Sequence, residues 1–232
     1  MDDNGRTLEV VRRVGQIVGF TAVWLGLLFG AAGRLDWTRA WIFVALYVVG
    51  MGITGVVVKR ANPDLLEARS KWRRKDTKSF DKLFLAVFVP LSTVQPAIAG
   101  LDVMRFRYSR MADWWLWPGV VLFVLGVALV AWSMVANRHA ETTVRIQNDR
   151  EHKVVTHGPY RFVRHPMYVG AIVMYFASAL ILGSEWALWT AGVITVLFVW
   201  RTTLEDRTLR RELPGYEAFA QQTRYRLLPG LW

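Results

Sequence analysis

Long apolar runs alternate with short polar segments along most of this chain. Four runs reach the roughly 20 residues that a helix needs to cross a hydrocarbon core of about 30 Å, and they cover 14–32, 37–58, 83–103 and 114–136. Two shorter runs follow at 167–182 and 186–200, separated by Gly183-Ser184-Glu185. Each is about 16 residues long, or roughly 24 Å as a helix, so we expect a tight, tilted helical hairpin.

This pattern predicts an all-α fold, a polytopic membrane bundle of about five to six transmembrane helices. We divide the chain into N-terminal transmembrane helices, 1–136, and a C-terminal region, 137–232, which together form one integrated domain. Pro90 and Pro96 fall inside the third run, which should therefore be kinked.

The connection 59–82 between the second and third runs is polar and strongly basic. We expect a solvated basic loop near the lipid headgroups. Alternatively, Asn62-Pro63 could start a surface helix, with apolar side chains along one face. These side chains would be Leu65, Leu66, Ala68 and Trp72.

Basic residues give the chain a formal net charge of +11, and their positions follow the membrane pattern. If the N-terminus is cytoplasmic, 24 of the 29 Lys and Arg residues lie in segments on the inner side and 5 in the outer turns. This asymmetry obeys the positive-inside rule. We therefore expect an integral, multi-pass protein of a bacterial inner membrane, with both termini and the segment 137–164 in the cytoplasm. The same distribution favours contact with membrane lipids over nucleic-acid binding.

Oligomerisation is open at this point. Gly50, Gly52 and Gly55 in the second run would permit a close contact between two copies of the chain, and they would serve packing within one copy equally well.

The sequence contains no cysteine, which excludes disulfides, thiolate metal sites and a cysteine nucleophile. The spacings of His139, His152, His157 and His165 match no zinc pattern, so we expect no metal. Three of these histidines fall in the polar segment 151–170, EHKVVTHGPYRFVRHPMYVG, which opens directly into an apolar run. We expect the chemistry of the protein in this segment.

The turn His165-Pro166-Met167-Tyr168 lies where this polar segment becomes a membrane helix. The first turn of a helix presents unpaired N–H groups and the positive end of the helix dipole, and Pro166 suits it because an N–H is not needed there. His165 and Tyr168 would share one face, next to a bound carboxylate. Alternatively, both side chains only anchor the helix entry at the membrane interface.

Arg201 and Glu205 lie four positions apart at the end of the last apolar run. On one helix they share a face, where they could form a weak surface ion pair. They also lie on the same membrane face as the His165 turn, so the two groups could meet across one pocket. Ionisable residues at this depth are candidates for function.

Three segments of the C-terminal region resemble a known family. GPYRFVRHPMYVG, WRTTLED and GYEAFAQQTRYRLLPGLW are similar to the C-terminal half of the isoprenylcysteine carboxyl methyltransferase family of integral membrane methyltransferases. The resemblance covers 137–232. It implies S-adenosylmethionine as the cofactor, bound in a cytoplasm-facing pocket of the C-terminal helices rather than in a Rossmann domain.

Residue by residue, the resemblance implies two sets of functional positions. The cofactor would contact Gln147, His152, Val154, Val155, Tyr160, His165, Pro166, Met167, Tyr168 and Glu205. Arg201 and Glu205 would be the catalytic residues, and Arg201 would also hold the carboxylate of the substrate.

The implied reaction is methyl transfer to the carboxylate of an isoprenylcysteine-like or other amphipathic lipid acceptor. Positioning and the exclusion of water would support it, because a carboxylate nucleophile needs no general base and Arg201 could clamp it. A lipid-facing opening between the third, fourth and fifth runs would admit the acceptor. Pro90, Pro96 and the small residues 97–100 could leave room for it, unless they only shape helix packing.

Other functions stay open. The acceptor could be a small thiol or a lipid amine, for which Glu205 would have to act as a base. Membrane sterol reductases have a similar C-terminal helical pocket but bind NADPH, whose 2′-phosphate needs basic residues. Such residues are present, namely Arg145, Arg150, Lys153, Arg161 and Arg164. A non-catalytic lipid-binding protein would keep the fold and would bind the cofactor, if at all, without needing Arg201 or Glu205.

Overall fold

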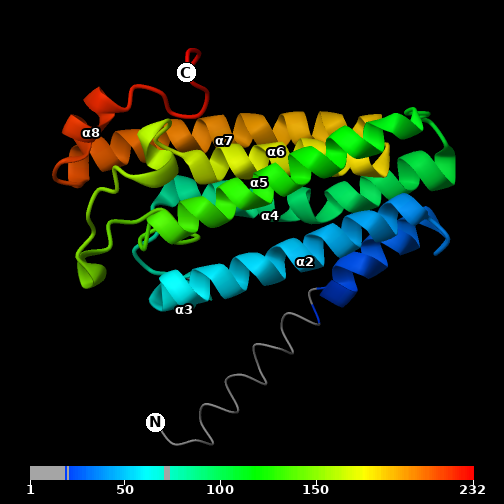
Figure 1. The fold of residues 1–232 in the computed structure, drawn as a ribbon, viewed down its shortest axis with the longest axis horizontal. Coiled ribbons are helices and arrows are strands. Elements are labelled where there is room, and N and C mark those ends of the chain that lie inside the picture. The colour runs from blue at the N-terminus through cyan, green and yellow to red at the C-terminus, as the bar shows by residue number, and fades with distance from the viewer. Residues whose placement is uncertain (1–18, 20, 71–73) are drawn as a thin grey trace, which may run out of the picture.

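The computed structural model describes residues 19, 21–70 and 74–232, and every regular element among them is helical (Figure 1). A helix over Thr21–Ala32 is followed by α2 (Thr38–Ala61), α3 (Pro63–Ser70), α4 (Ser79–Ala99), α5 (Leu116–Ala136), α6 (Pro166–Leu182), α7 (Glu185–Glu212) and α8 (Tyr216–Gln222). A π-helical segment, Gly100–Phe106, extends α4, and 3-10 turns cover Asp113–Trp115, Asn148–Arg150 and Gly158–Arg161. The all-α prediction is confirmed. The predicted first run, 14–32, lies partly outside the described residues.

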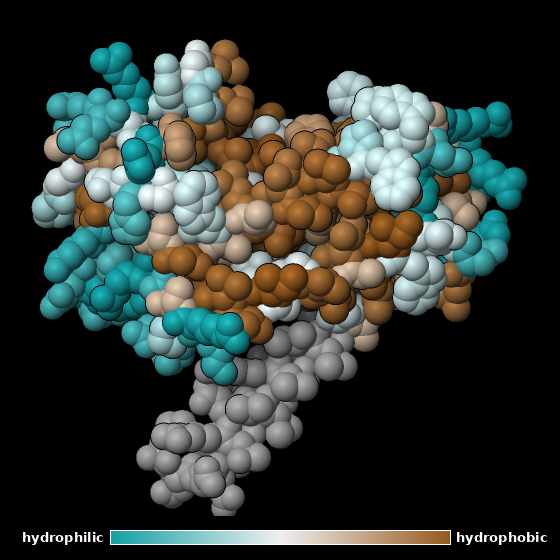
Figure 2. All heavy atoms as spheres, viewed as in Figure 1, coloured by the Kyte–Doolittle hydropathy of each residue, from teal (hydrophilic) through white to brown (hydrophobic). Residues whose placement is uncertain are grey.

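Four helical segments are long and apolar enough to cross a membrane, and two more are apolar but shorter. Figure 2 shows an apolar band across the middle of the bundle on the face in view, between more polar ends. On α2 the exposed apolar side chains include Val48, Val49, Ile53 and Val56. The chain is therefore a multi-pass membrane protein.

The prediction for the last apolar run is wrong in length. The sequence pattern predicts a helix of about 16 residues ending at Trp200, whereas α7 has 28 residues and continues to Glu212. A helix is held together by its backbone hydrogen bonds, which do not require apolar side chains. Only α6, with 17 residues, is as short as predicted. The two helices join where expected, at Gly183 with φ 78° and at Ser184, whose Oγ accepts the Ala187 N–H at 3.0 Å.

The connection between α2 and α4 is not simply a basic loop, because it contains the alternative surface helix, α3. Leu65 is completely buried and Ala68 is buried beside it. The Asn62 amide donates hydrogen bonds to the carbonyls of Met134 and Val135, each at 2.8 Å, at the end of α5. These contacts dock α3 against α5. Trp72 lies outside the described residues.

Glycines bring α5 and α6 into close contact. A Cβ atom on Gly170 would lie 2.8 Å from the carbonyl oxygen of Gly126, and one on Gly126 would lie 2.6 Å from Cγ of Met174. Small residues allow helix backbones to approach in this way in membrane proteins. The contact fixes the start of α6 next to the segment that leaves α5.

The segments that contain the predicted functional residues lie at one end of the bundle, on the left in Figure 1. This end holds α3, the segment 137–165, the last turns of α7, and α8. We call it the pocket end. The α6–α7 turn and the turn before α2 lie at the opposite end.

Candidate active site

A polar cavity of about 90 Å³ lies at the pocket end. Its walls come from the segment after α5, the start of α6, the middle of α7, and the start of α8. The residues predicted as functional that line it are Gln147, His152, Val154, Val155, Tyr160, His165, Met167, Tyr168, Arg201 and Glu205. Pro166 is the exception, because it is buried as the first residue of α6 and does not line the cavity.

The entry into α6 is held by the C-terminal segment of the chain. The N–H groups of Arg164 and His165 donate to the carbonyls of Tyr225 and Arg226, at 2.9 and 3.0 Å. His165 is the residue before the helix, and its own side chain does not cap it. Pro166 has no N–H, and the N–H groups of Tyr168 and Val169 donate to the His165 carbonyl at 3.1 and 3.3 Å. The first-turn N–H that lacks a helical partner is therefore that of Met167.

Tyr168 of α6 and Glu205 of α7 meet across the cavity. The Tyr168 hydroxyl donates a hydrogen bond to Oε2 of Glu205, and its ring stacks on the His165 ring with centroids 5.5 Å apart. Nε2 of His165 is buried without a hydrogen-bond partner among the described residues. The site thus combines a half-buried carboxylate with an imidazole nitrogen that makes no hydrogen bond to a described residue and lies 3.7 Å from Oδ1 of Asp206.

Arg201 binds neighbours on other elements, not Glu205 four residues away. Its Nε lies 2.8 Å from Oδ1 of Asp81, a completely buried carboxylate on α4. Its Nη2 donates to the Thr142 carbonyl at 2.9 Å, and its guanidinium lies 4.5 Å from the Phe84 ring centroid. The alternative of an isolated surface ion pair between Arg201 and Glu205 is therefore wrong. Asp81 itself accepts the Val144 N–H at 2.7 Å, so one carboxylate ties α4, α7 and the loop together.

Asp206 is a central residue that the sequence analysis did not single out. It is completely buried and binds Arg164 at 2.7 Å, Arg226 at 3.1 Å and Arg210 at 3.2 Å. The Tyr216 hydroxyl also donates to it at 3.0 Å. A signal was present in the sequence, since Asp206 follows Glu205 directly and precedes Arg210 by one helical turn.

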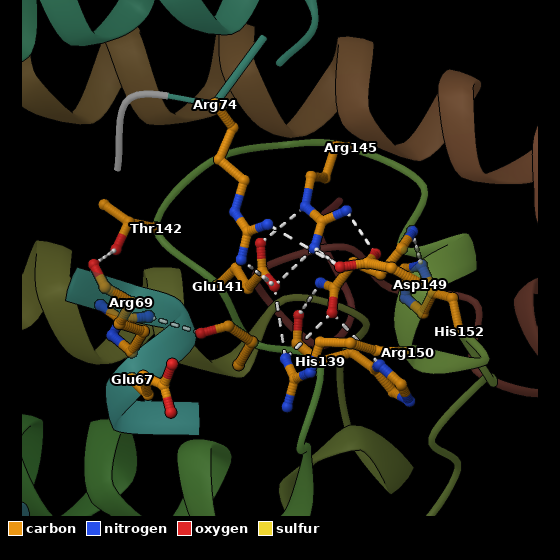
Figure 3. A network of polar contacts seen from close by, with 12 residues as sticks. Glu67, Arg69, Arg74, His139, Glu141, Thr142, Arg145, Asp149, Arg150 and His152 are labelled. Atoms are coloured by element: carbon orange, nitrogen blue, oxygen red, sulfur yellow. Dashed lines mark hydrogen bonds and ion pairs between the residues drawn. The ribbon is translucent and has the colours of Figure 1, made fainter. Parts of the chain in front are cut away.

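The loop that follows α5 is closed by a buried polar cluster (Figure 3). Arg145 binds Glu141 through Nε and Nη2, at 2.8 and 2.9 Å, and binds Asp149 at 2.7 Å and Asp76 at 3.0 Å. Hydrogen bonding to Glu141 raises the pKa of Arg145 above its usual range. Arg150 also approaches Glu141, at 3.3 Å. These pairs fix the loop in a closed form over the cavity.

Two histidines stack inside this loop. The rings of His139 and His152 lie 4.7 Å apart, and Nδ1 of His152 accepts the Gln147 N–H at 3.4 Å. Burial lowers the pKa of His152, the neighbouring His139 acts in the same direction, and the resulting pKa is about 4. The Gln147 amide donates to the His139 carbonyl at 2.7 Å, so its side chain supports the loop from inside.

The floor of the cavity is apolar. Val154 and Val155 pack with Tyr160 against residues around α8, namely Leu213, Tyr216, Phe219 and Ala220. The Tyr160 hydroxyl accepts a hydrogen bond from Asn137 at 3.2 Å, and burial raises the pKa of Tyr160 to about 12. This hydroxyl is therefore neutral and can serve as a donor. Within the described part of the chain, no three His, Asp or Glu side chains are grouped in a way that could hold a metal ion.

A second cavity, apolar and about 430 Å³ in volume, lies inside the bundle. The helix Thr21–Ala32 and α2 form walls of it together with α4, α5 and α6. The predicted opening between the third, fourth and fifth runs is thus only partly correct. Pro96 lines the cavity, but a Cβ on Gly100 would lie 2.7 Å from the Leu28 carbonyl, so this glycine serves helix packing.

The fold and the site define a class, a multi-pass helical membrane protein with a polar pocket at one end of its bundle. Residues 114–214, which include α5, α6, α7 and the loop over the pocket, match the family model "Phospholipid methyltransferase". A protein of Oryza sativa subsp. indica named "Probable protein-S-isoprenylcysteine O-methyltransferase" is 27% identical over 118 residues. "Protein-S-isoprenylcysteine O-methyltransferase A" of Arabidopsis thaliana is 28% identical over 90 residues.

These matches confirm the resemblance to the isoprenylcysteine carboxyl methyltransferase family. The aligned segments cover 50% of this chain and 56% of the rice protein, and 38% of this chain and 44% of the Arabidopsis protein. The chain thus spans about half the length of the curated relatives that it matches.

Proposed function

We propose that this protein is an S-adenosylmethionine-dependent membrane methyltransferase that acts on the carboxylate of an isoprenylcysteine-like or other amphipathic lipid acceptor. One observation carries the proposal: a polar pocket built by the His165 turn and Glu205 lies in the segment that matches methyltransferases, beside an apolar cavity inside the bundle. An enzyme that transfers a methyl group from a polar cofactor to a lipid needs such a pair of compartments.

The residues present fit this cofactor. Its positive centre and its amino group call for a carboxylate, which Glu205 supplies, and its carboxylate calls for a donor such as the Met167 amide in the first turn of α6. The buried Nε2 of His165 and the Tyr160 hydroxyl supply further polar contacts. When bound, S-adenosylmethionine supplies an electrophilic methyl group on its sulfonium.

Residues of the chain then position the reactants. Tyr168 holds the Glu205 carboxylate in one orientation through its hydroxyl. Arg201 lines the pocket on the same helix, and we propose that it faces the carboxylate of the acceptor. Such a nucleophile needs no base, so orientation and the removal of water carry the rate enhancement. We expect the loop, which the Arg145–Glu141 pair closes, to exclude water from the pocket.

The cavity volume of about 90 Å³ is smaller than this cofactor requires, because pockets that enclose ligands of such size measure about 300 to 1,000 Å³. We therefore expect the loop 137–155 to move outward when the cofactor binds and to close again over it. This movement would rearrange the pairs that Arg145 forms with Asp76 and Asp149 at the exposed edge of the cluster.

Three of the five basic residues considered for a 2′-phosphate are already paired with carboxylates, which argues against the NADPH-dependent reductase. Arg145 is bound by Glu141 and Asp149, and Arg164 by Asp206. Arg150 approaches Glu141 at 3.3 Å. A site for a 2′-phosphate needs positive charge that carboxylates have not already compensated, and these three arginines do not offer it.

Calorimetric titration of the detergent-purified chain tests the proposal. We expect saturable binding of S-adenosylmethionine and of its demethylated product, no binding of NADPH, and loss of cofactor binding in Glu205→Gln. Glu212→Gln is a matched control, since Glu212 lies on the same helix and binds Lys78 at the surface. Binding of NADPH alone would favour the reductase. Cofactor binding that survives both Glu205→Gln and Arg201→Gln would favour a non-catalytic lipid-binding protein.

If the cofactor binds as expected, transfer of a labelled methyl group to candidate acceptors identifies the acceptor class. Prenylated cysteine carboxylates should accept it. Transfer to a small thiol or a lipid amine instead would make Glu205 the candidate base.

A further inference from the structure

Arg69 of α3 lies where the polar pocket and the apolar cavity meet. Its side chain lines the apolar cavity. Its Nη1 donates to the Ala140 carbonyl at 2.6 Å and lies 3.9 Å from Sδ of Met167, and both of these residues line the polar pocket. Arg69 therefore stands at the boundary that an amphipathic acceptor would have to cross to reach the reacting end.

The guanidinium of Arg69 has no carboxylate partner within ion-pair distance among the described residues. The adjoining sequence Lys71-Trp72-Arg73 contains no acidic residue either. Glu141 attracts Arg69 only at longer range, since its carboxylate is already bound by Arg145. Burial lowers the pKa of Arg69, and the positive charge of Arg201 lowers it further. Arg69 is half-buried, and a cation that is partly removed from water without a counter-charge is unfavourable unless an anion joins it.

Arg201 is in a different state, although it is close to Arg69. Thr142 of the loop contacts both residues, because its hydroxyl donates to the backbone carbonyl of Arg69 at 3.2 Å and its own carbonyl accepts from the Arg201 guanidinium at 2.9 Å. Arg201 is paired with Asp81 at 2.8 Å. Arg201 thus has a buried carboxylate partner, whereas Arg69 has none within ion-pair distance among the described residues.

The apolar cavity indicates which anion fits. Its walls are mainly apolar and aromatic side chains, with Trp24, Phe43, Tyr47 and Phe123 among them. An anion that reaches Arg69 from this side must carry a long apolar chain. A small inorganic anion would leave the cavity empty of apolar contacts.

We propose that Arg69 binds the carboxylate of the acceptor while the apolar cavity holds its prenyl-like chain, an assignment that rests on the proposed methyltransferase function. Arg69 offers up to five donors in a planar fork that matches a carboxylate. It is a positioning and specificity-determining residue, and Arg201, fixed by Asp81, lies on the other side of the same group.

The test compares N-acetyl-S-farnesylcysteine with its carboxamide, which has the same chain but no charge. Binding of each to the full chain is measured, with S-adenosylmethionine binding measured in parallel. We expect the wild type to prefer the carboxylate by about tenfold or more, as for hydrogen bonds to charged groups. Arg69→Gln should abolish this preference, and Arg69→Lys should retain part of it. Arg60→Gln, which removes an exposed charge at the end of α2, should leave it unchanged.

A second variant distinguishes binding of the ligand's prenyl-like chain from binding of its carboxylate. Gly55 of α2 lines the apolar cavity, and a Cβ there would meet no atom within 4 Å. Gly55→Leu should therefore fold. It should lower the affinity for both ligands by a similar factor and leave the ratio of the two affinities unchanged.

Two results would overturn the assignment: a carboxylate preference that persists in Arg69→Gln, or a wild type that does not discriminate between the two ligands. Failure of the proposed function has a different signature, since the wild type would then not bind S-adenosylmethionine, whatever its preference between the two ligands. If Arg69→Gln does not fold, Arg69→Lys and Gly55→Leu decide between the outcomes.

Discussion

The Tyr168 hydroxyl on α6 donates a hydrogen bond to the Glu205 carboxylate on α7, and this bond joins the two parts of the pocket that lie far apart in the sequence. One partner belongs to the helix entry after the polar segment, and the other lies well inside the longest C-terminal helix. The orientation of Glu205 therefore depends on the packing of α6 against α7.

Tyr168→Phe removes only this hydroxyl. Because a hydrogen bond to a charged group contributes about 1.5 to 3 kcal/mol, we expect the affinity for S-adenosylmethionine to fall by about tenfold or more. Calorimetry measures this change. Tyr108→Phe, at a side chain that is 70% exposed, is the control and should bind as the wild type does. Unchanged affinity in Tyr168→Phe would remove Glu205 from the cofactor site.

Asp206→Asn should destabilise the fold more than it changes the chemistry. Loss of the carboxylate leaves the buried guanidinium of Arg164 without its counter-charge, and breaking a buried pair in this way costs about 3 to 5 kcal/mol. Thermal unfolding in detergent should show a lowered midpoint. The same change at Asp113, whose side chain is fully exposed, should leave the midpoint within the error of the measurement. An equal midpoint for both variants would contradict the structural role of Asp206.

Gly170→Ala should disturb the contact between α5 and α6. The new Cβ would lie 2.8 Å from the Gly126 carbonyl oxygen and 2.8 Å from Val130, and overpacking of this kind costs about 1 to 3 kcal/mol. The unfolding midpoint should fall, and the start of α6 should shift enough to weaken cofactor binding. Gly52→Ala, where a Cβ meets nothing within 4 Å, is the matched control.

Cofactor binding should weaken in mild acid because of His152. Its pKa is lowered to about 4 by burial in the closed loop, whereas an exposed histidine titrates near 6.5. Above about pH 6.5 both the closed and the opened loop hold a neutral His152, so its titration has no effect. As the pH falls from about 6.5 towards 4, the opened loop takes up a proton first and closure becomes less favourable. Below about 4 the effect levels off.

Hydrogen exchange of 139–155 measured across this range, with and without S-adenosylmethionine, checks the pH dependence. Protection should decline between about pH 6.5 and 4 in the wild type, and it should decline less in His152→Gln. His157→Gln changes an exposed ring just beyond the measured segment and should behave as the wild type does. A decline of equal size in both variants would rule out His152 as the titrating group.

Much of the architecture is readable from the chain itself. Membrane helices must satisfy their backbone internally and must be long and apolar, so the runs of the second, third and fourth spans are visible without tertiary information. The turn at Gly183-Ser184 and the helix start at Pro166 are local signals of backbone geometry. The prediction for the C-terminal end of α7 was wrong because it relied on polarity. Polarity marks where a helix leaves the membrane, not where its hydrogen bonding stops.

The sequence by itself determined which residue types stand at the pocket, because motif residues such as His165, Tyr168 and Glu205 lie in recognisable local segments. Only the tertiary structure decided their partners. Asp81 and Arg201 are 120 positions apart in the sequence. Arg69 is likewise far in the sequence from Met167, which its guanidinium approaches. Charge compensation is set by distances between helices, which no local pattern encodes. Among the described residues it pairs the Arg201 charge with Asp81 and leaves the Arg69 charge without an ion-pair partner.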